Sequence, residues 1–369
     1  MTFVLSEEQR ELLAAVNGFL EKHSAEEAVR TLMEQGGAAD PAVWSQLAGQ
    51  LGVAGLVIAE AYGGGGFGFG DVALVAEAAG AALLVAPLLA TVSAAAALTL
   101  SADEKLKADY LPGLASGEQI GTLAVAEQSG SWDLADTQTT ATPGADGDIV
   151  LAGVKMYVVD GQHADVLIVS ARSSQGVVDF YAVDATCPEV SVTALSPLDL
   201  TRAQARVEFA DAPARPLGVA GPRAERVLAT AAVLWSADAV GGAQRCLDMA
   251  VEYAKIRVQF GKPIGSFQAI KHMCADMLLE VESARSAAYW AAAALDDDDA
   301  DPLAAAALAK AYCGNAYAKV ASDNIQVHGG IGFTWEHPAQ LYFKRAKSSE
   351  ILFGEPAWQR ERMAAQVGL

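Results

Sequence analysis

The sequence is short of basic residues and of cysteine. Its 369 residues include 25 lysines and arginines against 45 aspartates and glutamates, giving a formal net charge of -20. Such a chain would be repelled by nucleic acids and anionic membranes, so neither is expected as a partner. The 4 cysteines are widely spaced with no C-x-x-C pair. This pattern indicates free thiols in a reducing compartment.

Signals for export, for a metal and for a hydrolase are also missing. The 5 histidines show no metal-ligand spacing, and no G-x-S-x-G turn is present. The N-terminus lacks the basic region and apolar core of a signal peptide, which predicts a cytoplasmic protein. The apolar run over residues 78–100 is long enough for a membrane span. It is mostly alanine and is broken by Pro87, so packed helices are expected instead and no membrane span is predicted.

Hydrophobic residues make up 52% of the chain, which is typical of a folded globular protein. Apolar residues recur at helical spacing up to about Gly117, with Ser6 expected to cap the first helix. Short β-branched runs separated by turn residues follow from Gly121 to near Pro216. After Gly221 the helical spacing returns and continues to the end.

These changes predict a mainly helical α+β protein with three domains. Residues 1–118 are expected to form an N-terminal helical domain, and residues 219–369 a C-terminal helical bundle. Residues 119–218 between them are expected to form a compact antiparallel β-domain.

A cationic stretch over residues 257–268 is expected to join two long helices. Helical spacing upstream ends at Phe260 and Pro263, and Ser266 is expected to cap the next helix. Lys255, Arg257, Lys262 and Lys271 fall in or beside this stretch, with no acidic residue between Tyr253 and Ala275. A local positive field in an acidic chain suits an anionic ligand. A helical hairpin with solvated charges is the alternative.

Five motifs together resemble those of the acyl-CoA dehydrogenase family, over essentially the whole chain. They are Glu60-Ala-Tyr62-Gly63-Gly64, Ala124-Val-Ala-Glu127-Gln-Ser-Gly130-Ser131-Trp-Asp133, Gly153-Val-Lys155-Met-Tyr157-Val-Val159, the arginine, phenylalanine-glycine and glutamine of residues 257–268, and Gln326-Val-His-Gly329-Gly330-Ile-Gly332. The set is specific, although each motif alone is weak. The same order of helical, β and helical domains is typical of this family.

The resemblance implies FAD bound across a subunit interface. In the family, the β-domain faces the flavin ring, which here implies Ser131, Tyr157 and Val159. A neighbouring subunit holds the pyrophosphate and adenosine end, and the residues implied here are Arg257, Phe260, Gln268, Gln326, Gly329 and Gly330. An arginine suits a pyrophosphate as a charge-assisted donor, and glycines allow close backbone approach.

The family's reaction needs a carboxylate base, and its usual position is altered here. The base takes the α-proton of an acyl-CoA thioester while hydride leaves the β-carbon for the flavin. It usually lies in a turn near the C-terminus, where this chain reads Leu352-Phe353-Gly354-Glu355. Phe353 then stands in the place of the base and cannot accept a proton. The catalytic residue is therefore unknown, with Glu355 as a candidate.

Other expected contacts are altered as well. Some relatives carry the base on the first long helix of the C-terminal domain, at the position of Ala231 or Ala232. Ala126 and Val159 stand where the family has threonines beside the flavin. These losses resemble the non-catalytic partner subunits of two-gene α2β2 acyl-CoA dehydrogenases, which actinobacteria use on steroid side chains.

The resemblance implies FAD-dependent α,β-dehydrogenation of an acyl-CoA in lipid or steroid β-oxidation. The expected partners are the acyl-CoA substrate, a catalytic subunit in an α2β2 heterotetramer, and electron-transfer flavoprotein or an equivalent acceptor. One alternative is a self-sufficient homotetramer that uses Glu355 or an unlocated base. A flavin-dependent monooxygenase of the same fold and a cofactor-free structural partner are the others.

Overall fold

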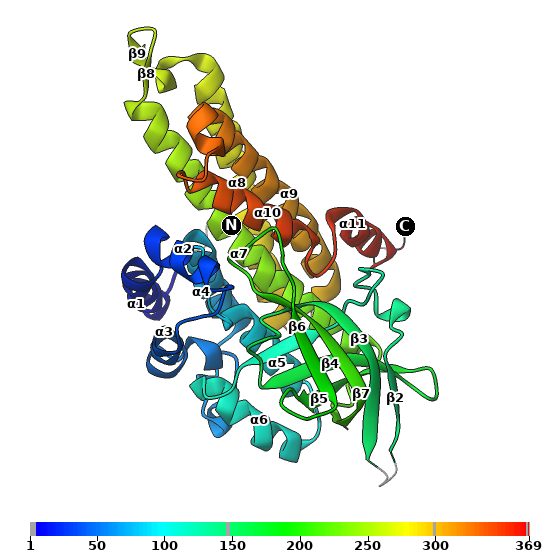
Figure 1. The fold of residues 1–369 in the computed structure, drawn as a ribbon. Helices are drawn as coiled ribbons and strands as arrows, with labels where there is room; N and C mark the ends of the chain where they lie inside the picture. The colour runs from blue at the N-terminus through cyan, green and yellow to red at the C-terminus, as the bar shows by residue number, and fades with distance from the viewer. Residues whose placement is uncertain (1–4, 145–147, 298–299, 367, 369) are drawn as a thin grey trace. The chain divides into compact units, whose positions relative to one another are not determined.

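The computed structural model describes residues 5–144, 148–297, 300–366 and 368 (Figure 1). The chain divides into two compact units. The helical unit comprises Met1–Arg30, Ala73–Leu84 and Ala232–Leu369, and the barrel unit comprises Thr31–Val72 and Val85–Ala231. The division predicted at residues 118 and 218 follows changes of secondary structure instead, and it stays a proposal.

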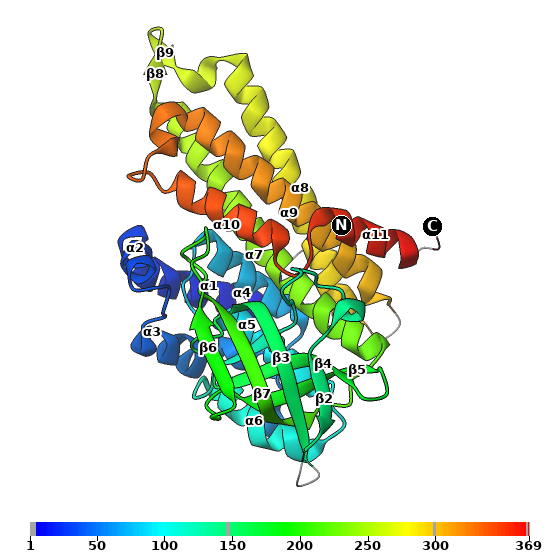
Figure 2. The ribbon, with the colours of Figure 1, turned by 45° about the vertical axis from the view of Figure 1, so that its right-hand side comes forward.

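Long helices dominate the helical unit, and α7, α8 and α9 run side by side in both views (Figures 1 and 2). Ser6 caps α1 in a capping box with Gln9, as predicted. The helices that contribute to this unit are α1 (Glu7–His23), α2 (Glu26–Glu34), α4 (Phe69–Ala81), α7 (Pro222–Ile256), α8 (Gln268–Asp296), α9 (Pro302–His328), α10 (Ala339–Ile351) and α11 (Pro356–Gln366).

Helices α4 and α7 touch backbone to backbone. A side chain at Gly80 would collide with the carbonyl of Asp238, and one at Gly241 would collide with the carbonyl of Glu77. Both positions therefore require glycine, and the crossing of the two helices is fixed by their main chains.

The barrel unit is built around one sheet whose strand pairings close on themselves. Strand β4 pairs with β2 and β5, and β3 and β7 complete the ring, while β1 pairs with β4 and β6 with β7. The interior is filled by inward-facing residues such as Leu151, Leu167 and Val183. The elements are α3 (Pro41–Ser45), α5 (Leu88–Thr99), α6 (Glu104–Ser116), β1 (Gly121–Ala124), β2 (Thr140–Pro143), β3 (Ile149–Val159), β4 (Val166–Ser173), β5 (Val178–Asp184), β6 (Val190–Ala194) and β7 (Gln204–Pro216).

The central β-domain is confirmed, but its description as antiparallel is wrong for two pairings. Strand β4 runs parallel to both β1 and β2, whereas the other pairings of this sheet are antiparallel. Local β-branched runs locate strands, but they do not show in which direction distant strands meet when a sheet closes.

Helix α8 begins at Gln268, and the predicted N-cap at Ser266 is wrong. Ser266 ends a short 3-10 turn, Ile264–Ser266, and Phe267 occupies the cap position without a side-chain hydrogen bond. The extra turn moves the serine away from the first free N–H groups of the helix.

Three further predictions, on cysteines, membrane spans and metal sites, can be compared with the described residues. All four cysteines are free, and among the described residues no helix is long and apolar enough to cross a membrane. The same part of the chain contains no cluster of three or more histidine, cysteine or acidic residues that could hold a metal ion.

Candidate functional site

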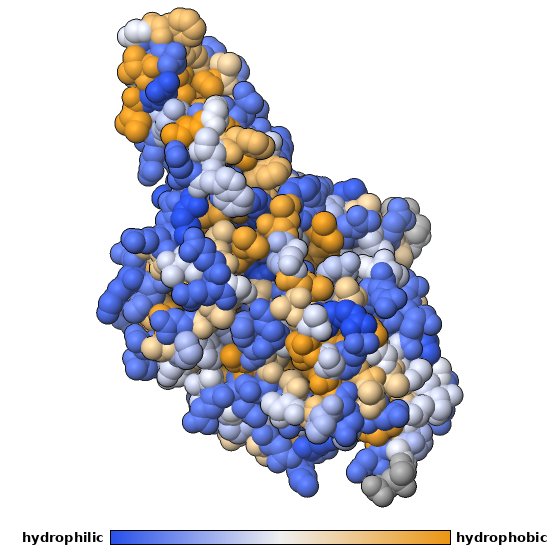
Figure 3. All heavy atoms as spheres, in the orientation of Figure 1, coloured by the Kyte–Doolittle hydropathy of each residue, from blue (hydrophilic) through white to orange (hydrophobic). Residues whose placement is uncertain are grey.

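The cationic stretch forms a hairpin at one end of the helical unit. Helix α7 ends at Ile256, and the short strands β8 (Val258–Gln259) and β9 (Lys262–Pro263) pair across a turn formed by Phe260 and Gly261. Phe260 has φ 52° and its side chain is 91% exposed. Hydrophobic surface gathers at this end of the unit (Figure 3). An aromatic ring held in solvent on a tight turn is available for a ligand or a partner.

Three polar side chains of the stretch and of α9 also point to solvent. Arg257, Gln268 and Gln326 are exposed, and none of them makes a side-chain hydrogen bond or an ion pair with another described residue. Guanidinium and amide groups of this kind are free to bind an external anion or heterocycle.

The paired glycines follow α9 directly. Helix α9 ends at His328, and Gly329 takes φ 64°. A side chain at Gly329 or Gly330 would meet nothing within 4 Å, so both glycines border open space. The Tyr253 and His328 rings stack at 4.4 Å, which brings the last turns of α7 and α9 together. Arg257 and the glycines therefore lie at the same end of the helical unit.

The residues predicted from the barrel unit differ in accessibility. The Ser131 hydroxyl donates to Asp136 at 2.6 Å. Tyr157 is 38% exposed and has φ 57°. Val159 is 3% exposed, and its carbonyl accepts a hydrogen bond from the Thr122 hydroxyl. Within this unit Tyr157 is the predicted residue whose ring reaches solvent.

A buried ion pair, not predicted from the sequence, joins the two motifs of the barrel unit. Lys155 Nζ donates to Glu127 at 2.8 Å, to the Val125 carbonyl at 3.0 Å and to Ser170 at 3.0 Å. Glu127 also accepts from the Thr139 backbone and hydroxyl. Burial lowers the pKa of Lys155 to about 8 despite this carboxylate. Burial opposes ionisation of Glu127, but Lys155 and Thr139 hold the pKa of Glu127 below its usual value.

The C-terminal turn carries a buried aromatic pair. Phe353 is 5% exposed, and its ring lies on Trp235 of α7 with centroids 5.4 Å apart. Trp235 is itself 3% exposed. The position expected for a base is therefore filled by two packed apolar rings.

The backbone of this turn is held by polar side chains. Lys310 is 1% exposed, and its Nζ donates to the carbonyls of Ser349, Glu350 and Gly354 at 2.9, 3.2 and 3.1 Å. The Phe353 carbonyl accepts from Gln359 at 2.7 Å. Phe353 is thereby kept at φ 58°, which is unfavourable for a residue with a Cβ.

The carboxylates near the predicted base positions are either exposed or already paired. The Glu355 side chain is exposed at the start of α11, while Ala231 and Ala232 are buried in α7. Asp238, one turn after Trp235, is a buried carboxylate that the sequence patterns did not reveal. It pairs with Arg345 at 2.7 Å, so its charge is already neutralised.

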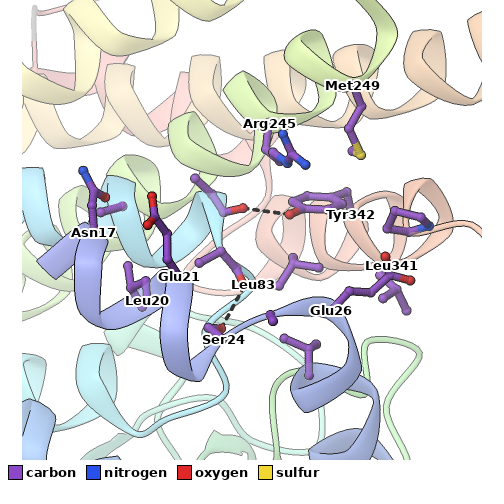
Figure 4. Close-up of a pocket in the computed structure, with 16 residues that line it drawn as sticks. Asn17, Leu20, Glu21, Ser24, Glu26, Leu83, Arg245, Met249, Leu341 and Tyr342 are labelled. Atoms are coloured by element: carbon purple, nitrogen blue, oxygen red, sulfur yellow. Dashed lines mark hydrogen bonds between the residues drawn. The ribbon is translucent and has the colours of Figure 1, made fainter. Parts of the chain in front are cut away.

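A separate cavity of about 460 Å³ opens between α1, α2, α4, α7 and α10 (Figure 4). Arg245 and Tyr342 line it together with Glu21 and Glu26. The Tyr342 hydroxyl donates to the Ala81 carbonyl at 2.7 Å. None of the residues predicted to bind the cofactor lines this cavity.

Comparison with known proteins decides the family. Residues 6–118 match the N-terminal domain of acyl-CoA dehydrogenases, and residues 222–368 match their C-terminal domain. Acyl-CoA dehydrogenase IpdE2 of Mycolicibacterium smegmatis is 37% identical over 98% of this chain and 100% of its own length. The chain belongs to the acyl-CoA dehydrogenase family. The predicted activity class is thereby confirmed: these are FAD-dependent oxidoreductases that act on CH–CH bonds.

Solved structures share the whole fold of this acyl-CoA dehydrogenase. The ChsE4-ChsE5 complex from Mycobacterium tuberculosis matches with a TM-score of 0.91 and 28% identity, covering 100% of this chain and 99% of the other. A variant of the Tcur3481-Tcur3483 steroid ACAD matches with a TM-score of 0.90 and 29% identity, covering 98% of each chain.

The residues at the end of the helical unit fit one part of FAD. The cofactor half-site comprises Arg257, Phe260, Gln268, Gln326, Gly329 and Gly330. A pyrophosphate would find an exposed guanidinium there, and open backbone at glycines where a Cβ would otherwise stand. In the barrel unit the fit is weaker, because Ala126 and Val159 present no polar side chain to a flavin.

Proposed function

We propose that this chain is the non-catalytic, FAD-holding subunit of a heteromeric acyl-CoA dehydrogenase. The observation that carries the proposal is the buried Phe353–Trp235 pair at the position expected for the base. Two packed rings with almost no exposed surface occupy this position, and neither ring can accept a proton.

In this proposal the cofactor half-site serves an FAD whose flavin ring is seated in the partner subunit. Arg257 would pair with the pyrophosphate, and the glycines would let the main chain approach it. Gln268 and Gln326 would donate to the adenosine end, against which Phe260 would pack. The bound flavin would accept hydride from the β-carbon of the acyl-CoA, and the partner subunit would supply the base.

The contrast between the exposed donors of the half-site and the buried base position supports an FAD-holding subunit that lacks the base. The half-site donors are exposed and make no side-chain hydrogen bond or ion pair with other described residues, as expected of groups that bind to a neighbouring chain's cofactor. The position expected for the base, by contrast, is occupied by the buried rings of Phe353 and Trp235. The steroid ACAD and the ChsE4-ChsE5 complex favour a bulky steroid-type acyl group and a heterotetramer for this chain as well. Electron-transfer flavoprotein or an equivalent would be the acceptor.

The test uses co-expression with a family member that carries the base. We expect the chain alone to be inactive and nearly colourless, and the purified complex to contain FAD and dehydrogenate an acyl-CoA. A yellow, active homotetramer of this chain alone would refute the proposal.

A charge reversal tests the half-site within that complex. Arg257→Glu should strip FAD, because a carboxylate that repels the pyrophosphate would replace the guanidinium that pairs with it. Lys271→Glu is the matched control, since Lys271 is also exposed at this end of the unit but lies outside the half-site. Flavin content is measured by absorbance after gel filtration. Equal flavin in wild type and Arg257→Glu would show that the half-site is misassigned.

A further inference from the structure

Two histidines close the loop that carries the paired glycines. His328 precedes the loop of residues 329–336, which begins with the 3-10 turn Gly329–Phe333, and His337 follows it. Their ring centroids lie 4.3 Å apart with the planes tilted by 47°, and His328 also stacks on Tyr253. The two ends of the loop are thus joined by the contact between the two histidine rings, and the His328 ring also packs on Tyr253 of α7.

Hydrogen bonds fix where the protons are. The Ala339 N–H, at the start of α10, donates to His337 Nδ1 at 3.2 Å, so this nitrogen is unprotonated. His328 Nδ1 lies 2.9 Å from the Asn324 carbonyl, which can only accept, so this nitrogen carries a proton. A second proton on His337 would remove the acceptor of Ala339 and put a charge beside the His328 ring.

The surroundings disfavour that second proton. Burial, and then the neighbouring His328, lower the pKa of His337. Glu26 and Arg30 of α2 pair with each other at 2.7 Å and act on His337 in opposite directions. Burial also lowers the pKa of His328, against which α7 presents the uncharged Tyr253 ring.

Apart from the two histidines, the loop is held by its own 3-10 turn, by the Thr334 hydroxyl, which donates to the Ile331 carbonyl at 2.8 Å, and by Lys344 of α10, which lies 3.6 Å from the centroid of the exposed Trp335 ring. Ile331 and Phe333 are 47% and 80% exposed, so these large side chains do not anchor the loop in a core. On the other side, Pro338 lines the 460 Å³ cavity of Figure 4 together with Glu26 and Arg245.

We propose that His328 and His337 form a neutral clamp that positions the loop of residues 329–336, and that protonation of His337 releases this loop. They are positioning residues for Gly329 and Gly330, so the consequence for the cofactor rests on the proposed function. The clamp itself is a property of this chain alone.

The direction of the pH effect follows from proton linkage. The folded chain binds a proton on His337 more weakly than an unfolded chain does. The stabilisation is then fully present above the ordinary histidine pKa of about 6.5 and is lost progressively as the pH falls below it.

Hydrogen exchange of the purified chain tests the clamp. We compare backbone protection of residues 330–336 at about pH 7.5 and about pH 5.5, on either side of the ordinary histidine pKa, after correction for intrinsic rates. Wild type should lose protection several-fold at the lower pH. His337→Phe keeps a ring against His328 but cannot take a proton. In this variant the protection of residues 330–336 should therefore be the same at both pH values. His272→Gln, at an exposed histidine of α8, should behave as wild type.

A second variant covers the case in which His337→Phe does not fold. His337→Asn keeps a side-chain acceptor for Ala339 and also cannot be protonated at this pH. Protection that changes with pH equally in wild type and in the folded variants would overturn the clamp.

Flavin retention by the assembled complex at the same two pH values separates the clamp from the proposed function. A clamp that opens at low pH while FAD stays bound would refute the role of the half-site and leave the clamp standing. Flavin loss at low pH that persists in His337→Phe would refute His337 as its cause.

Discussion

Replacing Phe353 tests whether the position expected for the base is packed as a core. The ring is 5% exposed and lies on Trp235. A buried phenylalanine removes about 200 Å² from water, which at about 25 cal/mol per Å² corresponds to about 5 kcal/mol. Phe353→Ala should therefore lower the free energy of unfolding by about 3–5 kcal/mol, since part of the gap can collapse. Phe353→Leu fills most of the volume and should cost about 1 kcal/mol.

The assay is equilibrium urea unfolding followed by circular dichroism. Ile351→Ala, two residues away and 58% exposed, is the control and should change the free energy by less than about 0.5 kcal/mol. The strained φ of Phe353 is common to wild type and both variants and cancels. A loss of less than about 1 kcal/mol in Phe353→Ala would show that the ring faces an open cavity. The argument for a closed base position would then fail.

Two other substitutions address the remaining carboxylates. Glu355→Gln should leave turnover of the assembled complex unchanged, because Glu355 is exposed at the start of α11; lost turnover with an intact flavin spectrum would identify it as the base. Glu127→Gln should cost about 3 kcal/mol at neutral pH by leaving Lys155 buried without its carboxylate. Since the pKa of Glu127 is lowered in the fold, this difference in unfolding free energy from wild type should shrink as the pH falls below about 4.3. Glu118→Gln, at an exposed carboxylate of the same unit, is the control and should show no such pH dependence, and a constant difference for Glu127→Gln would contradict the linkage.

The sequence predicts the ends of helices well where a single capping or helix-ending residue sets them. Pro302 and the glycine after His328 are signals of this kind, and α9 runs from Pro302 to His328. Ser6 caps α1 as expected. Ser266 is not the N-cap of α8, because it ends a short 3-10 turn before the helix. This turn depends on how the hairpin folds back and not on the serine itself.

Contacts between distant residues were beyond the sequence patterns. The sequence shows Phe353 in the place where the family has its base. Nothing in the sequence indicates that Trp235 packs against this phenylalanine. His328 has no partner that can be recognised in the sequence, because His337 meets it only once the loop after α9 has closed. Two histidines flanking a glycine-rich loop are a signal that could have suggested the pair.

The assignment of the cofactor half-site came from motifs and stays a prediction. The structure contributes the exposure of Arg257, Gln268 and Gln326 and the open space at the paired glycines. These are properties that residue spacing alone does not give.

The buried lysine of α9 has a consequence for how such chains diverge. Lys310 and Gln359 donate to main-chain carbonyls of the C-terminal turn, so these hydrogen bonds do not depend on which side chain residue 353 carries. An ancestral subunit could exchange the residue at this point, and refill the space behind it with an indole, while its backbone stayed in register. After a gene duplication, one copy could thus lose its proton acceptor and still assemble with the other, because the change is confined to side chains inside an unchanged frame.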